Sequence, residues 1–241
     1  MVKEIVKKFI PKGYHKFVRK YKDLLFDAYA TKSYSQEGED IILSYIFIEK
    51  KTAGFYVDVG AHHPKRFSNT YFFYEKGWRG INIDAMPGSM ELFKKIRPRD
   101  INLEIAISDK KQEVTYYMFN DPALNGFSKE LSAEINSKGK YRIIDEIKME
   151  TSTLNEVLDT YLPENIEIDF LSVDVEGLDL QVLKSNDWNK YKPKVVLVES
   201  LDFSFDNLGN SEIYKFLVSK GYHLAAKTRH TLFFVNNCFK E

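Results

Sequence analysis

GFYVDVGAHHP, at Gly54–Pro64, is the stretch that decides the fold of this 241-residue chain. An apolar run that ends in Asp58 and Gly60 is typical of the first strand of a nucleotide-binding α/β domain. A helix-like segment follows and ends near Gly77, and a second apolar strand, GINIDAM, carries Asp84 near its end. A strand, a tight turn, a helix and an acid-tipped second strand form the first half of a Rossmann-like unit, in which the acid accepts hydrogen bonds from both ribose hydroxyls.

The loop after Gly60 departs from the dinucleotide-binding pattern. Ala61, His62, His63 and Pro64 stand where further glycines would let backbone N–H groups approach a diphosphate. A ligand without phosphates, such as S-adenosylmethionine, relaxes that demand. An NAD-dependent oxidoreductase would use the same acidic ribose contact, but its glycine-rich turn is missing. The alternative to any cofactor site is that these acids and the glycine are ordinary strand-end and turn residues.

The chain resembles the FkbM-type S-adenosylmethionine-dependent methyltransferases from about Ser33 to its C-terminus. Four segments carry the resemblance: SYSQEGEDIIL (33–43), YVDVGAHHPKRFSNTYFFYEKGWRGINIDAMPGSM (56–90), LEIAISD (103–109) and IDFLSVDVEGLDLQVLKS (168–185). The second and fourth are specific to the family. Many members have an acidic residue and a glycine where His63 and Pro64 stand in this chain.

The order of predicted elements agrees with the fold that this resemblance implies. Strand-like runs at 55–59, 81–83, 102–107, 170–173 and 194–198 alternate with helical patterns, as parallel strands require. GYHLAAKT and RHTLFFVNN then predict two strands at an antiparallel end of the sheet. We therefore expect an α/β, Rossmann-like class I methyltransferase fold with a mostly parallel seven-stranded sheet, helices on both faces and an antiparallel C-terminal strand.

By resemblance, the C-terminal ends of the first parallel strands form the cofactor cleft. Gln36 belongs to a segment expected to close over the methionine end of the cofactor, although Ser35 and the acidic residues after it also suit a simple helix cap. Asn69 is expected either at the cofactor carboxylate or as a helix cap. The cofactor-binding residues that we predict are Gln36, Asp58, Gly60, Ala61, His62, Asn69, Asp84, Ala85, Met86, Ala106 and Ile107.

Methyl transfer to oxygen requires an acceptor hydroxyl held in line with the methyl group and a base that takes its proton. Asp174 and Glu176, in SVDVEGLD, follow the fourth parallel strand, and their spacing puts both carboxylates on one side if the strand continues. They suit a general base, ligands of a divalent cation, or caps of the next helix. Glu199 is a third candidate, His63 is an alternative base, and His230 is a weaker one.

Composition and charge limit the other classes of function. The formal net charge is zero, which argues against a nucleic-acid-binding protein. The single cysteine, Cys238, excludes an intramolecular disulfide framework, fits a reducing cytoplasm and is expected to be buried. The polar stretch 120–150 is predicted either as a substrate lid, with Phe127, Ser128 and Tyr141 at a sugar, or as a surface excursion.

Residues 1–32 are predicted as a basic amphipathic helical arm before a methyltransferase domain at 33–241. Within the first 22 residues, eight Lys and Arg residues face only Glu4, and apolar residues recur at helical spacing. Such an arm suits peripheral contact with the inner membrane face, and it equally suits packing on its own domain. No stretch is long and apolar enough for a transmembrane helix.

The sequence thus predicts a cytoplasmic O-methyltransferase that uses S-adenosylmethionine. Family habit suggests a sugar hydroxyl of a nucleotide-sugar, polysaccharide or other glycoconjugate precursor as acceptor. The alternatives are an NAD-dependent oxidoreductase and a non-catalytic membrane-docking module with a Rossmann-like fold.

Overall fold

The computed structural model describes residues 29–49, 53–201 and 203–239. The chain divides into two compact units, Met1–Ser33 and Tyr34–Glu241, and the second contains all the helices and strands described below. Residues 1–28 of the predicted basic arm lie outside the described residues.

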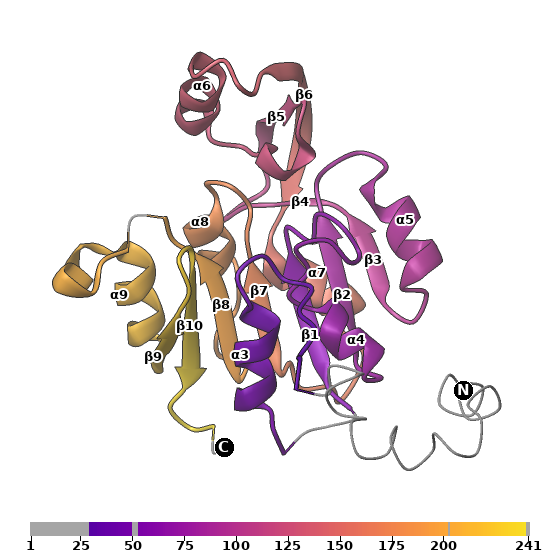
Figure 1. Ribbon diagram of the computed structural model, residues 1–241, viewed down its shortest axis with the longest axis vertical. Helices are drawn as coiled ribbons and strands as arrows, with labels where there is room; N and C mark the ends of the chain where they lie inside the picture. The colour runs from indigo at the N-terminus through magenta and orange to yellow at the C-terminus, as the bar shows by residue number, and fades with distance from the viewer. Residues whose placement is uncertain (1–28, 50–52, 202, 240–241) are drawn as a thin grey trace, which may run out of the picture. The chain divides into compact units, whose positions relative to one another are not determined.

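A seven-stranded sheet forms the centre of the Tyr34–Glu241 unit (Figure 1). Its strands, in spatial order, are β3 (Ile101–Glu104), β2 (Arg79–Asp84), β1 (Phe55–Val59), β7 (Phe170–Val173), β8 (Val195–Glu199), β10 (Thr231–Asn236) and β9 (Tyr222–Lys227). The first five strands are parallel, and β10 is antiparallel to both β8 and β9. The predicted sheet, with its antiparallel C-terminal strand, is confirmed.

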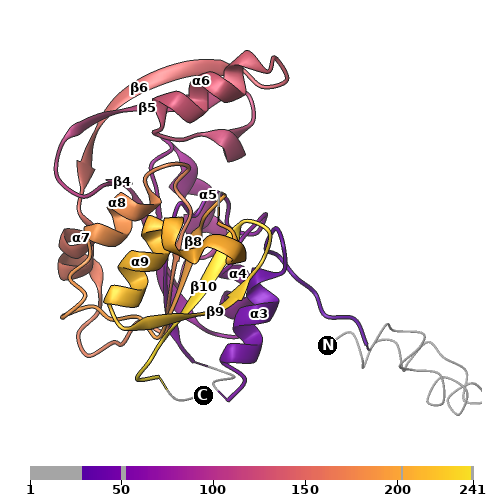
Figure 2. The same cartoon turned by 90° about the vertical axis from the view of Figure 1, so that its left-hand side faces the viewer.

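Helices cover both faces of this sheet because side chains alternate between the faces along each strand. Tyr56 and Phe170 face an apolar layer shared with α3 and α4, whereas Val57 and Leu171 face a layer shared with α7, α8 and α9. Figures 1 and 2 show these helices around the sheet. The helices are α3 (Glu39–Ile46), α4 (Tyr71–Glu75), α5 (Ser89–Ile96), α7 (Leu154–Tyr161), α8 (Asp179–Lys184) and α9 (Glu212–Ser219), with the 3-10 helix η3 (Phe205–Asn210) before α9.

A separate excursion leaves the sheet after β3 (Figure 2). It contains β4 (Ala106–Ile107), β5 (Glu113–Phe119), η2 (Pro122–Leu124), α6 (Lys129–Ser137) and β6 (Ile143–Ser152). Its strands form a second sheet in the order β4–β6–β5. The prediction of one strand over 102–107 is therefore wrong, because the chain turns at Ile105 and β4 pairs with β6 instead of with β2.

Two further parts of the chain differ from the sequence interpretation. Cys238 lies in the turn after β10 and is exposed, so its prediction as a buried thiol is wrong. Strand β6, which closes the excursion, has no counterpart among the predicted strands.

A buried polar network fixes the first strand. Arg97 has no exposed surface, and its guanidinium donates to Asp100 at 2.8 Å, to Tyr56 Oη at 2.8 Å and to Thr70 Oγ1 at 2.9 Å. Thr70 Oγ1 in turn donates to Asp58 at 2.8 Å. Burial raises the pKa of Asp58, while the Arg97 charge opposes that rise. The network holds the end of β1 against α4 and the start of β3.

Replacing Arg97 by Gln is expected to lower the free energy of unfolding by about 3–5 kcal/mol, because it leaves buried Asp100 without its cation. Urea denaturation of the variant and of the wild type measures the difference. Arg79→Gln, at an exposed position of β2, is the matched control and should change stability by less than about 0.5 kcal/mol. Equal effects of the two substitutions would contradict a stabilising role for the network.

Candidate functional site

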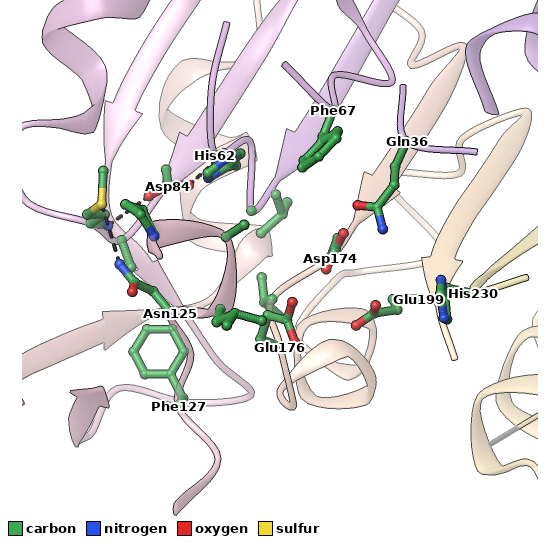
Figure 3. A pocket seen from close by; sticks show the side chains of 18 of the residues that line it. Gln36, His62, Phe67, Asp84, Asn125, Phe127, Asp174, Glu176, Glu199 and His230 are labelled. Carbon is green, nitrogen blue, oxygen red and sulfur yellow. Dashed lines mark hydrogen bonds between the residues drawn. The ribbon is translucent and has the colours of Figure 1, made fainter. Parts of the chain in front are cut away.

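A cavity of about 530 Å³ opens at the C-terminal edge of the parallel strands (Figure 3). Gly60 after β1, Asp84 at the end of β2, Asp174 after β7 and Glu199 at the end of β8 all line it. Ligands of open α/β sheets bind at this edge, where successive strands deliver their C-terminal residues. The cavity therefore lies where the sequence predicted a cofactor cleft.

Gly60 lets two loops meet at the floor of the cavity. Its backbone has a φ of +85°, and a Cβ added there would lie 1.6 Å from the carbonyl oxygen of Asp174. The Gly60 N–H donates to Ile83 O at 2.9 Å, and the Asp174 N–H donates to Val59 O at 2.9 Å. No residue with a side chain fits this contact without moving one of the two loops.

Asp84 connects the loop after β1 to the tip of β2. One carboxylate oxygen accepts the His62 N–H at 2.8 Å, and the other accepts the Met86 N–H at 2.8 Å. Burial raises the pKa of Asp84, and these two hydrogen bonds oppose the rise. Each carboxylate oxygen has a second lone pair, so Asp84 can hold its own loops and still accept hydrogen bonds from a ligand.

Twelve of the sixteen predicted cofactor-binding and catalytic residues line the cavity: Gln36, Gly60, His62, Asn69, Asp84, Ala85, Met86, Ile107, Asp174, Glu176, Glu199 and His230. Asn69 donates to Ser172 Oγ at 3.1 Å and does not cap α4, whose N-cap is Thr70. Asn69 therefore lines the cavity and is not the N-cap of α4.

The other four predicted residues, Asp58, Ala61, His63 and Ala106, are not brought to the cavity. Asp58 faces the buried network instead. Ala61 packs against Met90 and Phe93. The Nδ1 of His63 accepts the N–H groups of Lys65 and Arg66 at 3.1 and 2.9 Å. His63 therefore stabilises its own turn, and Ala106 starts the excursion as part of β4.

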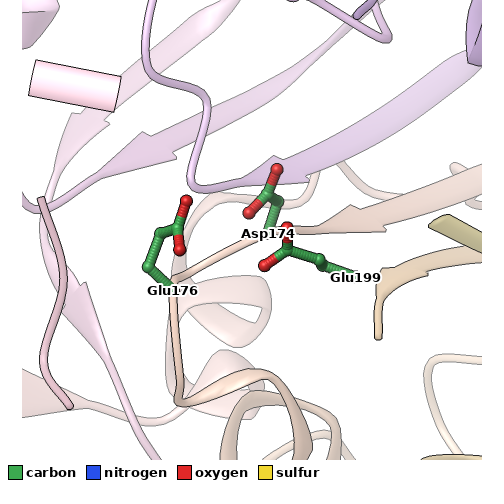
Figure 4. A group of neighbouring side chains, drawn as sticks. All are labelled: Asp174, Glu176 and Glu199. Carbon is green, nitrogen blue, oxygen red and sulfur yellow. The ribbon is translucent and has the colours of Figure 1, made fainter. Parts of the chain in front are cut away.

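Three carboxylates converge on one side of the cavity (Figure 4). One oxygen from each of Asp174, Glu176 and Glu199 lies within 4.8 Å of the others. Strand β7 ends at Val173, so the strand does not continue through Asp174 and Glu176, which was the condition attached to their shared side. Glu176 instead has a left-handed backbone with φ of 51°, and this turn brings its side chain back toward Asp174.

Helix capping does not account for this cluster. The carboxylate of Asp179 takes the loop's donors, accepting the Val175 N–H at 3.1 Å and the Gly177 N–H at 3.3 Å. The side chain of Asp174 is exposed to the cavity and lies deep among the residues that line it. Burial, followed by the charge of Glu199, raises the pKa of Asp174 well above the usual range. Burial, followed by the neighbouring acids, raises the pKa of Glu176 to about 8.

The excursion contributes the opposite wall of the cavity. Tyr116, Asn125, Phe127, Leu131, Ile135 and Tyr141 line it. Two glycines permit the close approach of the excursion to the acidic loop. A Cβ at Gly126 would lie 2.8 Å from the Cβ of Glu176, and a Cβ at Gly177 would lie 2.7 Å from the Cβ of Ser128. The excursion thus packs directly on the loop that carries the acids.

The segment before α3 closes a further side. Gln36 points into the cavity (Figure 3), and the carboxylate of Glu37 contacts Nδ1 of His230, in the turn between β9 and β10. Asp40 is buried and accepts the Tyr34 N–H at 2.7 Å and the Ser35 hydroxyl at 2.9 Å. Asp40 therefore fixes the loop of this segment, and Gln36, Glu37 and Glu39 line the cavity.

Strained backbone concentrates at this site. Four described residues other than glycine have a left-handed backbone, and three of them, His62, Phe67 and Glu176, line the cavity. Such conformations persist where the surrounding structure enforces them and are frequent at ligand sites. The sequence interpretation missed Phe67, Arg66, Glu37 and Tyr116, and no residue pattern around them distinguishes them from ordinary loop and strand residues.

The fold and the site define a Rossmann-like protein of the class I methyltransferase type. The family model described as "Methyltransferase FkbM domain" matches residues 58–224. The chain belongs to this family, which confirms the resemblance found in its sequence.

Solved structures give further matches at low identity. The FkbM methyltransferase from Methylobacillus flagellatus KT matches with a TM-score of 0.47 and 13% identity, over 76% of this chain and 43% of that chain. The O-methyltransferase from Bacillus cereus in complex with SAH matches with a TM-score of 0.41 and 8% identity, over 97% and 96% of the two chains. This chain thus spans less than half of the Methylobacillus protein. The search of curated proteins finds no match.

Glu176→Gln is expected to stabilise the protein against unfolding at pH 8 but not at pH 5. The folded-state pKa of Glu176 is raised from its ordinary value of 4.5 to about 8, so the folded protein binds more protons between these values. Stability is therefore lost as pH rises through this interval, and the substitution removes that loss. Thermal unfolding of both proteins at pH 5 and pH 8, in the presence of a chelator, measures the difference in stability.

At this chain length, each kcal/mol of relieved repulsion raises Tm by about 2–4 °C. Glu164→Gln, at an exposed position, is the control and should give no pH-dependent difference. A Glu176→Gln protein that is less stable than the wild type at pH 8 would contradict the account of the acidic cluster.

Proposed function

We propose that the protein transfers a methyl group from S-adenosylmethionine to the oxygen of a sugar hydroxyl, on a nucleotide-sugar, a polysaccharide or another glycoconjugate precursor. The observation that carries the proposal is a single cavity in which Asp84, at the tip of β2, faces the same space as the acidic cluster after β7 and β8. A donor ribose and an acceptor hydroxyl both find suitable partners there.

The residues present fit S-adenosylmethionine. Asp84 is placed for the ribose hydroxyls, and Met86, Ile105 and Ile107 offer apolar surface for adenine. Asn125 of the excursion donates to the sulfur of Met86 at 3.4 Å, which extends that wall. The cofactor, when bound, supplies an electrophilic methyl group on a sulfonium.

Polar groups suit the methionine end of the same cofactor. The side-chain amides of Gln36 and Asn69 both line the cavity, and each can donate hydrogen bonds to its carboxylate.

The loop after β1 does not suit a dinucleotide. The N–H groups of Gly60 and Ala61 both donate to Ile83 O, at 2.9 and 3.0 Å, and the His62 N–H donates to Asp84. A pyrophosphate would need free N–H groups at this turn. These internal hydrogen bonds favour a phosphate-free cofactor over NAD.

The acidic cluster and the aromatic side chains suit a sugar acceptor. Carboxylates accept hydrogen bonds from hydroxyl groups, and the apolar faces of pyranose rings pack against aromatic rings such as those of Phe67 and Phe127. Asp174, Glu176 and Glu199 are also a suitable oxygen-ligand set for a divalent cation that would orient the acceptor oxygens. Loss of methyl transfer on chelation, restored by added metal, would indicate contact through a cation. Methyl transfer that chelation does not change would indicate direct contact between the carboxylates and the acceptor.

We propose further that the protein is cytoplasmic and that residues 1–32 bind the inner membrane face. The Lys and Arg residues of this basic arm suit anionic headgroups. No helix within the described residues is long and apolar enough to cross a membrane.

Loss of liposome sedimentation on deletion of the first 30 residues would support the membrane-binding role of the arm, and unchanged sedimentation would contradict it.

Asp84→Ala is expected to weaken binding of S-adenosylhomocysteine by at least about tenfold, since it removes hydrogen bonds to a charged acceptor worth about 1.5–3 kcal/mol each. Calorimetric titration with S-adenosylhomocysteine and, in parallel, with NAD measures both affinities. Glu91→Ala, on the exposed side of α5, is the control and should bind as the wild type does. Tight NAD binding without a response to S-adenosylhomocysteine would refute the proposed cofactor.

Asp174→Asn and Glu176→Gln are expected to retain affinity for S-adenosylhomocysteine within about threefold, an effect of less than about 1 kcal/mol. Both should lower the rate of methyl transfer by about 100-fold or more, because they remove groups that orient the acceptor. Transfer of a labelled methyl group to a panel of methyl hexopyranosides and nucleotide-sugars measures the rate. Unchanged rates in both variants would remove the cluster from the reaction.

A further inference from the structure

We propose that His230 is the general base that takes the proton of the acceptor hydroxyl, and that Glu37 is the positioning residue that orients its ring. The inference deepens the proposed function and rests on it. It assigns the proton transfer to a pair of residues that lie 193 positions apart in the sequence and outside the acidic cluster.

Glu37 holds His230 at two points. The Nδ1 of His230 lies 2.5 Å from Oε1 of Glu37, and the His230 N–H donates to Oε2 of the same carboxylate at 3.0 Å. One carboxylate thus holds both the ring and the backbone of the histidine. A carboxylate at Nδ1 selects the tautomer with its proton on that nitrogen, which leaves the lone pair of Nε2 free.

Further hydrogen bonds support the turn that carries His230. Its carbonyl accepts the Ser200 N–H at 2.8 Å, directly after β8. Glu39 accepts hydrogen bonds from the hydroxyls of Thr228 and Thr231, each at 3.3 Å, so it holds both ends of the turn. These hydrogen bonds fix the backbone from which the His230 side chain extends, as the precise placement of a catalytic base requires.

The ring of His230 lies beside the acidic cluster. His230 lines the cavity, and about 30% of its side chain remains exposed. Thr231 pairs with Glu199 across β10 and β8, and Figure 3 shows His230 next to Glu199, which is followed by Asp174. An acceptor hydroxyl that contacts the acidic cluster therefore lies on the side of the cavity that the imidazole occupies.

The charges around the pair agree with these roles. Burial alone would raise the pKa of Glu37, but the hydrogen bond from the His230 N–H, together with the His230 ring, lowers it. Glu37 is therefore ionised at neutral pH and able to stabilise the imidazolium that forms when the ring takes a proton. The same arrangement orients the histidine in other carboxylate–imidazole pairs that act as bases.

The proton and electron balance is complete. The hydroxyl O–H bond breaks and its proton passes to Nε2 of His230. The hydroxyl oxygen forms a bond to the methyl carbon while the bond from that carbon to sulfur breaks, and the electron pair of the broken bond remains on sulfur. The products are the methyl ether, neutral S-adenosylhomocysteine and a protonated His230 that returns its proton to water.

The tautomer of His230 tests the proposal without a methyl acceptor. Long-range ¹H–¹⁵N correlation spectra of the full chain bound to S-adenosylhomocysteine identify it, and His230→Gln assigns the signals. We expect Nδ1 protonated and Nε2 unprotonated in the wild type, and loss of this preference in Glu37→Ala. His223, at the other end of the same hairpin, is the control and should not change. A proton on Nε2 in the wild type would overturn the proposal.

Turnover tests the base itself, with the panel acceptor that reacts fastest. His230→Ala should lower kcat by about 100-fold or more while binding S-adenosylhomocysteine as the wild type does. Added imidazole should restore part of the rate, which a merely structural histidine would not allow. An unchanged kcat, or a loss that imidazole does not restore, would overturn the proposal. Absence of transfer in the wild type would count against the proposed function and leave the tautomer to decide the role of the pair.

Discussion

The contact between the backbones of Gly60 and Asp174 is the constraint on which the site depends. It joins the loop after β1 to the loop after β7, two neighbouring parallel strands. Since there is no room for a Cβ between them, the first loop must turn sharply and the second must begin with its carboxylate at the cavity floor. The position of the candidate donor site and that of the acidic cluster thus follow from one glycine.

Two buried systems hold that contact in place. On one face, the network around Arg97 binds Asp58 through Thr70 and fixes the end of β1. At the loop itself, Asp84 accepts the His62 N–H and ties the turn to β2. Asp58 and Asp84 therefore have different tasks, although both follow apolar strand residues. Asp58 is structural, whereas Asp84 remains open to a ligand.

The parts of the fold that the sequence predicted well are those with local signals. The apolar runs of β1 and β7 coincide with the predicted ranges, because Gly54 and Gly60 bound the first and Asp169 and Asp174 bound the second. Gly60 and Asp84 were predicted because a turn glycine and a strand-end acid at this separation have a known physical use. Strand β6 also had a local signal, since Ile147 and Met149 alternate with charged residues, but the charges of this segment hid it.

The parts that could not be predicted depend on long-range contacts. Glu37 and His230 meet only because α3 and the β9–β10 turn lie at the same edge of the sheet. Glu176 reaches Asp174 through a left-handed residue, which no pattern in SVDVEGLD indicates. The predicted base His63 proved to bind its own turn, because its ring nitrogen lies within reach of two following N–H groups.

The most direct test of the central claim is a crystal structure of the protein grown with S-adenosylhomocysteine. The account predicts the ribose hydroxyls on the carboxylate of Asp84 and the sulfur on the side of the cavity where Asp174 lies. A ligand bound elsewhere, or bound in this cavity without contact to Asp84, would contradict it.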